Sequence, residues 1–136
     1  PGVHPVTALP ELLPTAEVVV LIVPLTPATA RLADADFLSR MPDGALLVNA
    51  ARGGVVDTDA LIAETRSGRL RAALDVTDPE PLPPDNPLWT FPNVFITPHV
   101  GGAVPTFFDK AYRLAGEQVR RFAAGRELDN VVRGDY

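Results

Sequence analysis

Short apolar runs alternate with stretches in which apolar residues recur every three or four positions. The runs are rich in Val, Ile and Leu and predict strands at residues 18–23, 45–49, 71–75 and 94–97. The helical spacing predicts helices at residues 34–41, 58–67 and 105–124. Strands that alternate with helices in this way predict an α/β fold with a parallel sheet and right-handed crossovers.

Several details of this pattern lead to sharper expectations. The run V-V-V-L-I-V at 18–23 has no polar alternation, which predicts a strand buried on both faces. Gly68 and Gly125 are expected to end the second and third helices. The proline-rich stretch 78–92 predicts a loop, in which Trp89 is expected to be a packing anchor. Residues 130–132 are a candidate short edge strand.

Composition narrows the class of protein. The chain has 136 residues, 46% of them hydrophobic, which is enough for one packed core. The net charge of −5 and the lack of a basic patch interleaved with aromatic residues argue against a nucleic-acid partner. No run of 18 apolar residues predicts a membrane span, and no signal peptide is readable. The absence of cysteine excludes disulfides, a thiolate nucleophile and a cysteine metal site, and it fits the cytoplasm, where we expect the protein.

The stretch at 46–57, L-L-V-N-A-A-R-G-G-V-V-D, offers the first candidate chemistry. A buried strand runs into Arg52, which is followed by two glycines, and Asp57 can cap the next helix. A guanidinium at the end of a buried strand is well placed to hold a carboxylate through two parallel hydrogen bonds. Alternatively, Arg52 lies in a surface loop and pairs with a nearby acid. This stretch alone leaves both alternatives open.

Polar and small residues follow each predicted strand. In a parallel sheet the residues after the strands gather at one edge, where ligands of such folds bind. The residues that are expected there are Pro24, Thr26, Ala50, Ala51, Arg52, Asp75, Glu80, His99, Gly101 and Gly102.

Among these residues, His99 is the candidate acid–base group, because an unperturbed imidazole titrates near neutrality. Glu80 lies in the loop that leads into the last strand, and a carboxylate paired with a histidine favours its protonated form. Taken singly, His99 could be a histidine at a helix entrance, Glu80 a solvated loop acid and Asp75 a turn cap. Their shared position at one edge favours the functional interpretation. There is no Gly-x-Gly-x-x-Gly turn, no serine nucleophile pattern and no histidine pair, so no metal site is expected.

Four segments make the chain resemble the C-terminal part of the D-isomer-specific 2-hydroxyacid dehydrogenases, an NAD-dependent family that includes phosphoglycerate, glycerate/hydroxypyruvate and D-lactate dehydrogenases. The first two segments are V-V-V-L-I-V-P-L-T-P-A-T at 18–29 and M-P-D-G-A-L-L-V-N-A-A-R-G-G-V-V-D-T-D-A-L at 41–61. The others are A-L-D-V-T-D-P-E-P-L-P at 73–83 and P-L-W…P-N-V-F-I-T-P-H-V-G-G at 87–102. They keep the order and approximate spacing of the family.

The resemblance implies a role for each matching residue. The substrate-binding arginine falls on Arg52, the acid–base histidine on His99 and the glutamate that orients it on Glu80. The remaining matches are on the cofactor side and comprise Pro24, Thr26, Ala50, Ala51, Asp75, Gly101 and Gly102, with Arg52 and His99 also near the cofactor. The implied activity is hydride transfer between NAD and a small 2-oxo or 2-hydroxy acid, and NADP stays open.

The resemblance also implies a division of the chain. Residues 1–104 would be the second half of a Rossmann-type NAD-binding domain, and residues 105–136 a long C-terminal helix and tail that return toward a substrate domain. That substrate domain and the Gly-x-Gly-x-x-Gly half are missing, so we expect a fragment with weak or no activity alone and a homodimer at full length. Thr77 and Val104 depart from the family pattern. The alternative to a dehydrogenase is a non-catalytic NAD-binding corepressor, because corepressor relatives of the family keep the residues that match Arg52, Glu80 and His99.

Overall fold

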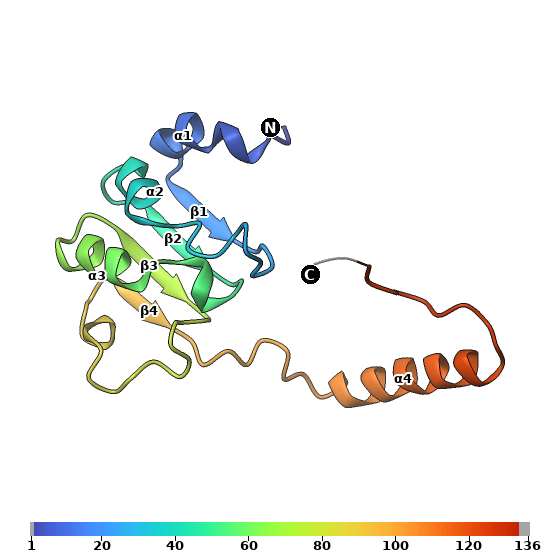
Figure 1. Ribbon diagram of the computed structural model, residues 1–136. Coiled ribbons are helices and arrows are strands. Elements are labelled where there is room, and N and C mark those ends of the chain that lie inside the picture. The colour runs from blue at the N-terminus through green and yellow to red at the C-terminus, as the bar shows by residue number, and fades with distance from the viewer. Residues whose placement is uncertain (1, 134–136) are drawn as a thin grey trace. The chain divides into compact units, whose positions relative to one another are not determined.

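The four predicted strands form one parallel sheet in the order β1-β2-β3-β4 (Figure 1). They are β1 (Val18–Leu21), β2 (Leu46–Asn49), β3 (Arg71–Leu74) and β4 (Val94–Ile96). The computed structural model describes residues 2–133 and divides the chain into two compact units, Pro1–Pro98 and His99–Tyr136. The sheet belongs to the first unit, and its parallel order confirms the predicted α/β fold.

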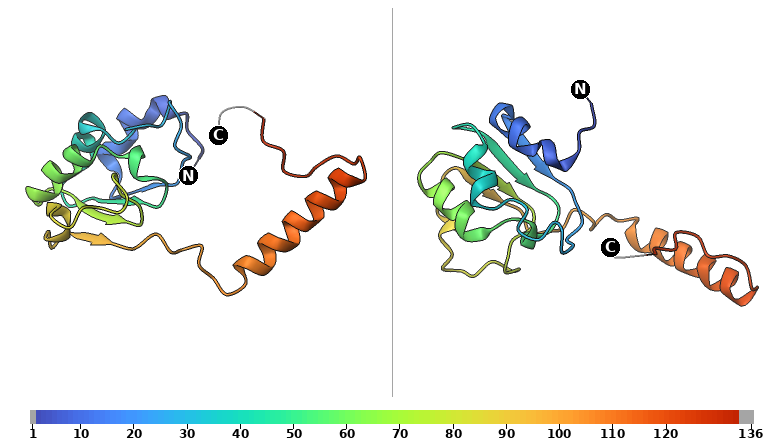
Figure 2. Two further views of the ribbon diagram at one scale, coloured as in Figure 1. Left: turned by 60° about the horizontal axis from the view of Figure 1, so that its bottom comes forward. Right: turned by 45° about the horizontal axis from the view of Figure 1, so that its top comes forward.

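Two helices connect the first three strands, and both lie on the same side of the sheet in two views (Figures 1 and 2). Asp34 caps α2 (Ala35–Arg40) by accepting a hydrogen bond from the backbone N–H of Phe37, and Asp57 caps α3 (Thr58–Arg66) in the same way through Ala60. After α3, Gly68 takes a φ of +76°, as expected for the residue beyond a helix end. Both helices therefore have the boundaries that their sequence signals favour.

The core lies between these helices and one face of the sheet. Leu21, Leu47 and Leu74 from the strands join Leu38 and Leu61 from the helices in one buried cluster. Alternate strand residues point to this face because the side-chain period of a strand is two. Burial of this apolar face is the main source of stability for the first unit.

The opposite face of the sheet corrects the prediction that the first strand is buried on both faces. Val18 and Val20 are each 53% exposed, and Ile22, just past the strand, is 76% exposed. Phe95 of β4 is exposed as well. The reason is that β1 is an edge strand and that α2 and α3 cover only the other face of the sheet. An apolar run without alternation therefore does not show that both faces of a strand are buried.

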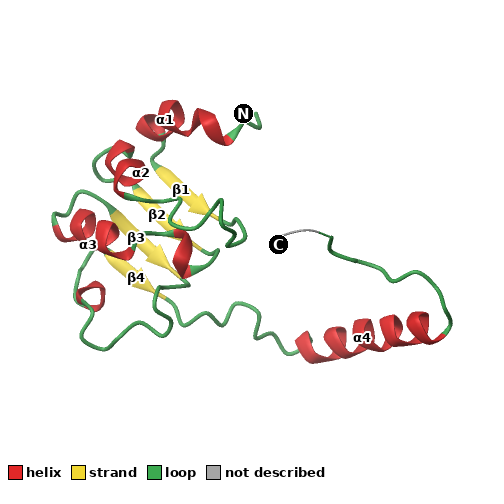
Figure 3. Ribbon diagram, in the orientation of Figure 1, coloured by secondary structure: helices red, strands yellow, loops and turns green. Residues whose placement is uncertain are grey.

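Short helical turns occupy the remainder of the first unit (Figure 3). The N-terminal stretch contains η1 (Val6–Ala8), α1 (Leu9–Leu12) and η2 (Leu13–Thr15). A further turn, η3 (Gly53–Val55), follows Arg52, and η4 (Pro87–Trp89) lies in the proline-rich loop. In that loop Leu88 is buried whereas Trp89 is 51% exposed, so the packing anchor is Leu88 and the prediction for Trp89 was wrong.

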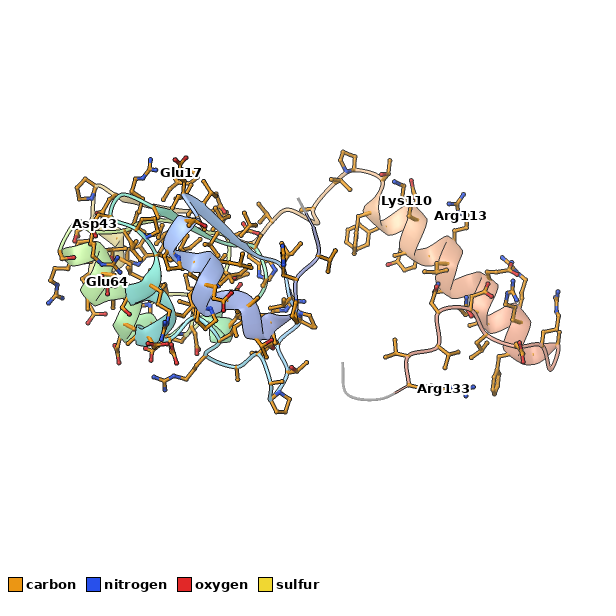
Figure 4. The ribbon with its side chains drawn as sticks, turned by 90° about the horizontal axis from the view of Figure 1, so that it is seen from above. Glu17, Asp43, Glu64, Lys110, Arg113 and Arg133 are labelled. Carbon is orange, nitrogen blue, oxygen red and sulfur yellow. The ribbon has the colours of Figure 1, made fainter. Side chains whose placement is uncertain are left out.

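The second unit consists of the segment from His99 and the helix α4 (Phe107–Ala123). Gly125, with a φ of +64°, follows the end of α4, as predicted. At 100° per residue, one broad side of α4 is apolar, and its exposed large members are Phe107, Phe108, Tyr112, Leu114, Val119 and Phe122. Lys110 and Arg113 belong to the polar side and project from the helix together (Figure 4). Residues 130–132 form no strand, which contradicts the prediction of an edge strand there.

Candidate functional site

The last residues of the four strands lie side by side in one row. Leu21 pairs with Asn49, Asn49 with Leu74 and Leu74 with Ile96. Three hydrogen bonds extend the row by one residue: the N–H of Ala50 donates to the Leu21 carbonyl, that of Asp75 to Asn49 and that of Thr97 to Leu74, at 2.9–3.1 Å. Ala50, Asp75 and Thr97 therefore share the carboxyl edge of the sheet, where ligands bind in open α/β folds.

Arg52 lies two residues beyond this row. Its backbone is extended, with φ −146° and ψ 149°, and its side chain is exposed. Nη1 donates to the carbonyl of Ala51 at 2.7 Å. Within residues 2–133, the guanidinium takes part in no ion pair, which leaves it able to receive a carboxylate from solution. Arg52 is thus exposed in a loop, as the surface-loop alternative expected, but no acid among residues 2–133 pairs with it.

Asp75 is fixed by a residue to which the sequence had given no role. Thr97, directly after β4, donates its hydroxyl to Oδ1 of Asp75 at 2.5 Å. Both side chains are half-buried. A hydroxyl that donates to a carboxylate holds its orientation. The signal in the sequence was a hydroxyl residue at the end of the predicted strand 94–97.

Glu80 is exposed and lies in the loop that leaves β3. The start of this loop is tied to the Arg52 loop at two points. The hydroxyl of Thr58 donates to the carbonyl of Asp78 at 2.8 Å. Gly53 fits so closely that a Cβ there would lie 1.8 Å from the carbonyl oxygen of Thr77. The loops that carry Arg52 and Glu80 are thus in backbone contact near their strand ends.

Pro24 and Thr26 belong to a turn after β1. Thr29 organises this turn: its hydroxyl donates to the carbonyl of Pro24 at 2.5 Å and accepts from the N–H of Thr26 at 2.8 Å. Leu25 of the same turn packs against Gly54, next to the Arg52 loop. The turn after β1 and the loop after β2 therefore meet at the same edge of the first unit.

His99, Gly101 and Gly102 belong to the second unit and are all exposed. His99 has a φ of +53°, a left-handed backbone conformation that is uncommon for residues other than glycine and is often found at functional sites. An open apolar hollow in this unit is lined by His99, Val100, Gly102, Ala103, Val104, Pro105, Phe107 and Phe108. The structure thus places three of the ten predicted site residues in a unit of their own.

Perturbed charges in the first unit lie beside the candidate site. Arg31 hydrogen-bonds to Asp57, and this bond, together with the backbone N–H of Ala60, holds the pKa of the Asp57 carboxyl below its usual value. The same bond raises the pKa of Arg31. In the described part of the chain, no cluster of three His, Cys, Asp or Glu side chains is arranged to hold a metal ion. The same residues include no helix with the length and apolar character needed to cross a membrane.

The small residues at the strand ends suit a flat cofactor ring. Ala50 is exposed at the carboxyl end of β2, and its methyl group leaves the strand end accessible to a ring that approaches face-on. Ala51 beside it is buried. The sequence contains no glycine-rich turn of the Gly-x-Gly-x-x-Gly type, which binds a pyrophosphate in dinucleotide-binding folds.

Residues 2–101 match the family described as "D-isomer specific 2-hydroxyacid dehydrogenase, NAD binding domain". The chain is 39% identical over 132 residues to D-3-phosphoglycerate dehydrogenase of Methanocaldococcus jannaschii, covering 96% of this chain and 25% of that protein. It is 45% identical over 95 residues to the human glyoxylate reductase/hydroxypyruvate reductase, covering 69% of this chain and 29% of that protein. The chain thus spans between a quarter and a third of these two relatives.

Solved structures show the same similarity. A D-isomer specific 2-hydroxyacid dehydrogenase from Xanthobacter autotrophicus Py2, in complex with NADPH and MES, superposes with a TM-score of 0.85 at 43% identity, over 96% of this chain and 54% of that one. The holo D-mandelate dehydrogenase of Rhodotorula graminis gives a TM-score of 0.85 at 35% identity, over 94% of this chain and 37% of that one.

Proposed function

Because the chain belongs to the D-isomer-specific 2-hydroxyacid dehydrogenase family and carries its NAD-binding domain, we propose that it supplies the catalytic residues of an NAD(P)-dependent dehydrogenase acting on a small 2-oxo or 2-hydroxy acid. The observation that carries this proposal is Arg52. It is an exposed guanidinium at the carboxyl edge of a parallel sheet, without an ion pair within the part of the chain that the structure describes.

Arg52 binds the carboxylate of the substrate in this proposal. A 2-oxo acid carries a carboxylate next to a carbonyl, and the planar guanidinium can donate to both. Its fixed, extended backbone and its position beside Ala50 support this role, because a substrate held there would lie next to the nicotinamide side of the cofactor site. Orientation of the two reactants is the main contribution that the protein makes to such a reaction.

His99 is the proposed acid–base residue, and Glu80 is the residue that stabilises its protonated form. When the 2-oxo acid is reduced, the imidazolium donates a proton to the carbonyl oxygen; in the reverse direction the neutral ring accepts the hydroxyl proton. The left-handed backbone of His99 supports a functional role. Glu80 belongs to the first unit and His99 to the second, so their pairing is part of the proposal.

The cofactor, when bound, supplies or accepts the hydride. Pro24, Thr26, Ala50, Ala51 and Asp75 of the first unit, with Gly101 and Gly102 of the second, are the proposed lining residues. The hydrogen bond from Thr97 fixes the orientation of the Asp75 carboxylate, as a residue beside the nicotinamide ring would require. The two cofactors NAD and NADP are distinguished by residues outside this chain, so the proposal covers both.

Several properties of the whole protein follow only as proposals, because the chain covers 25–54% of the relatives described above. We expect the 136 residues alone to show weak or no turnover, and the longer protein to be a cytoplasmic homodimer with no nucleic-acid partner. The proposed division is a partial cofactor domain at 1–104 and a helix and tail at 105–136 that pack on a substrate domain. The corepressor alternative has no support, because the relatives with a stated activity are dehydrogenases and reductases.

The deciding experiment is NADH and NADPH oxidation by the full-length protein that carries this chain. Glyoxylate, hydroxypyruvate, pyruvate and phosphohydroxypyruvate are offered in turn, and absorbance at the nicotinamide band is followed. We expect turnover of at least one of these acids and none of the matching amides, which lack the carboxylate that Arg52 would bind. Absence of turnover with every 2-oxo acid would contradict the proposal.

A further inference from the structure

Asn49 is a polar residue at a position where the strand pattern calls for an apolar one. It ends β2, points to the same face as Leu47, and is only 1% exposed. A buried carboxamide is unfavourable unless its donor and acceptor both find partners. A leucine at this position would be the simpler way to fill the core, so the partners of Asn49 should indicate why the polar group is there.

Both polar atoms of the Asn49 side chain bond to the loop that carries Arg52. Nδ2 donates to the backbone carbonyl of Arg52 at 3.0 Å, and Oδ1 accepts from the backbone N–H of Ala51 at 3.0 Å. The Arg52 carbonyl accepts a second hydrogen bond from the N–H of Val55 at 3.1 Å. The backbone is thus fixed from the core at the Ala51 N–H and at the Arg52 carbonyl.

The next residue continues this fixation toward the loop that carries Glu80. Gly53 is buried, and a Cβ there would lie 1.8 Å from the carbonyl oxygen of Thr77 and 2.7 Å from the N of Asp78. These atoms are backbone, so they cannot turn aside as a flexible side chain would. The carbonyl of Arg52 is therefore held by Asn49, and Gly53, the next residue, is packed against the Thr77–Asp78 backbone.

We infer that Asn49 is a positioning residue for substrate binding: its buried carboxamide sets the direction in which Arg52 leaves the sheet. This inference rests on the proposed function of Arg52 as the carboxylate-binding residue and adds the group that orients it. A long side chain at an exposed site gains a defined direction only from its own backbone and from the Ala51 carbonyl that it contacts. Asn49 bonds to the N–H of Ala51, directly before that attachment point, and to the carbonyl of Arg52 itself.

The test is the kinetics of Asn49→Asp in the full-length protein. Aspartate keeps an acceptor for the Ala51 N–H but replaces the donor to the Arg52 carbonyl with an oxygen, which repels that carbonyl. We expect KM for the 2-oxo acid to rise about tenfold or more, because misplacement of a binding group by a fraction of an ångström weakens a two-point contact. The dissociation constant of NADH should change by less than about twofold.

Thr65→Val is the matched control. Thr65 is also 1% exposed, and its hydroxyl donates to the carbonyl of Leu61 at 2.7 Å within α3. The control removes a buried side-chain hydrogen bond that has no contact with the Arg52 loop. It should lower the melting temperature without changing KM. Asn49→Ser serves as a second, smaller variant if Asn49→Asp does not fold, with the same expected rise in KM.

A double-mutant cycle separates positioning from general stability. If Asn49 acts through Arg52, then Asn49→Asp should have little further effect on kcat/KM once Arg52 is replaced by alanine. Independent effects that multiply would overturn the inference, as would an unchanged KM in a folded Asn49 variant. Absence of turnover in the unaltered protein would overturn the proposed function as well, whereas normal turnover with an unchanged KM in Asn49→Asp would overturn the inference alone.

Discussion

Residues 49–58 begin at the last residue of β2, and residues 99–106 follow β4. Each stretch carries three residues of the proposed site, which are Ala50, Ala51 and Arg52 in the first and His99, Gly101 and Gly102 in the second. In the first stretch, Asn49, Gly53 and Val55 are buried and the loop is bonded to the core and to a neighbouring loop. In the second stretch every residue is exposed, including the apolar Val100 and Val104. One stretch is therefore held by its own unit, and the other exposes side chains that normally seek burial.

In the proposed function, the difference separates recognition of the substrate charge from proton transfer. Arg52, the proposed carboxylate-binding residue, is held by contacts within the first unit. The proposed proton-transfer half pairs Glu80 of the first unit with His99 of the second. The following changes test the two halves separately, from the largest expected effect to the smallest.

His99→Ala tests the proton-transfer half and should have the largest effect. Loss of a general acid–base group lowers kcat by roughly 100- to 10,000-fold. Binding of NADH to the full-length protein, measured by fluorescence, should be largely retained. His4→Ala is the control, because His4 is exposed near the N-terminus and should leave kcat unchanged. Loss of NADH binding or of folding in His99→Ala would mean that His99 is structural.

Arg52→Lys tests the recognition half. The ammonium keeps the charge but loses the planar fork, so at least one charge-assisted hydrogen bond to the substrate carboxylate disappears. Such a bond contributes about 1.5–3 kcal/mol, which corresponds to a rise in KM of roughly 10- to 100-fold. Arg66→Lys on the exposed side of α3 provides the control, with KM unchanged. Unaltered kinetics in Arg52→Lys would remove Arg52 from the site.

Glu80→Gln tests whether Glu80, in the first unit, supports proton transfer by His99, in the second. Loss of the carboxylate removes the charge that is proposed to stabilise the protonated His99 during proton transfer. We expect kcat to decrease about tenfold at neutral pH. Glu11→Gln, at an exposed acid in α1, should leave kcat unchanged. An unchanged kcat in Glu80→Gln would separate Glu80 from proton transfer.

The position of the strand ends was predicted better than the other features, whereas the roles of the residues that follow them stay predictions. Strand ends can be located from apolar runs, and a parallel sheet brings them to one edge, so Arg52 and Asp75 could be placed together without a structure. The burial of Asn49 was not predicted, because an asparagine at the end of a strand is also typical of a turn. Its bonds to Ala51 and Arg52 depend on the path of the loop, which a local pattern does not determine.

Predictions that depended on the surroundings of a residue were less successful. The run V-V-V-L-I-V indicated a strand, but its exposure is set by where β1 lies in the sheet and by which face the helices cover. Similarly, size and apolarity favoured Trp89 as the anchor of the proline-rich loop. The buried residue is Leu88, while the Trp89 indole donates to the carbonyl of Pro83 at 2.9 Å from an exposed position. Both errors concern packing partners and not secondary structure.

The smallest expected effect tests how the recognition half is anchored from the helix that follows it. Asp57 caps α3 and pairs with Arg31, and these bonds lower the pKa of Asp57 from its ordinary value near 3.8. Its contribution to stability is therefore present above that value and lost as the pH falls through the lower, folded-state pKa. At pH 7, Asp57→Ala should reduce the free energy of unfolding by about 1 kcal/mol, mainly through the lost cap.

Urea unfolding of the chain, followed by circular dichroism at several pH values, measures this contribution. The difference between Asp57→Ala and the unaltered chain should shrink as the pH falls below about 3.8 and through the lower folded-state pKa of Asp57. Asp59→Ala is the control, since Asp59 lies in the first turn of the same helix and its charge acts on the helix dipole and, as a smaller effect, on Arg31. A difference that stays constant with pH would assign the effect to packing, and the Arg52 loop would then be anchored by Asn49 and Gly53 without help from the charged cap.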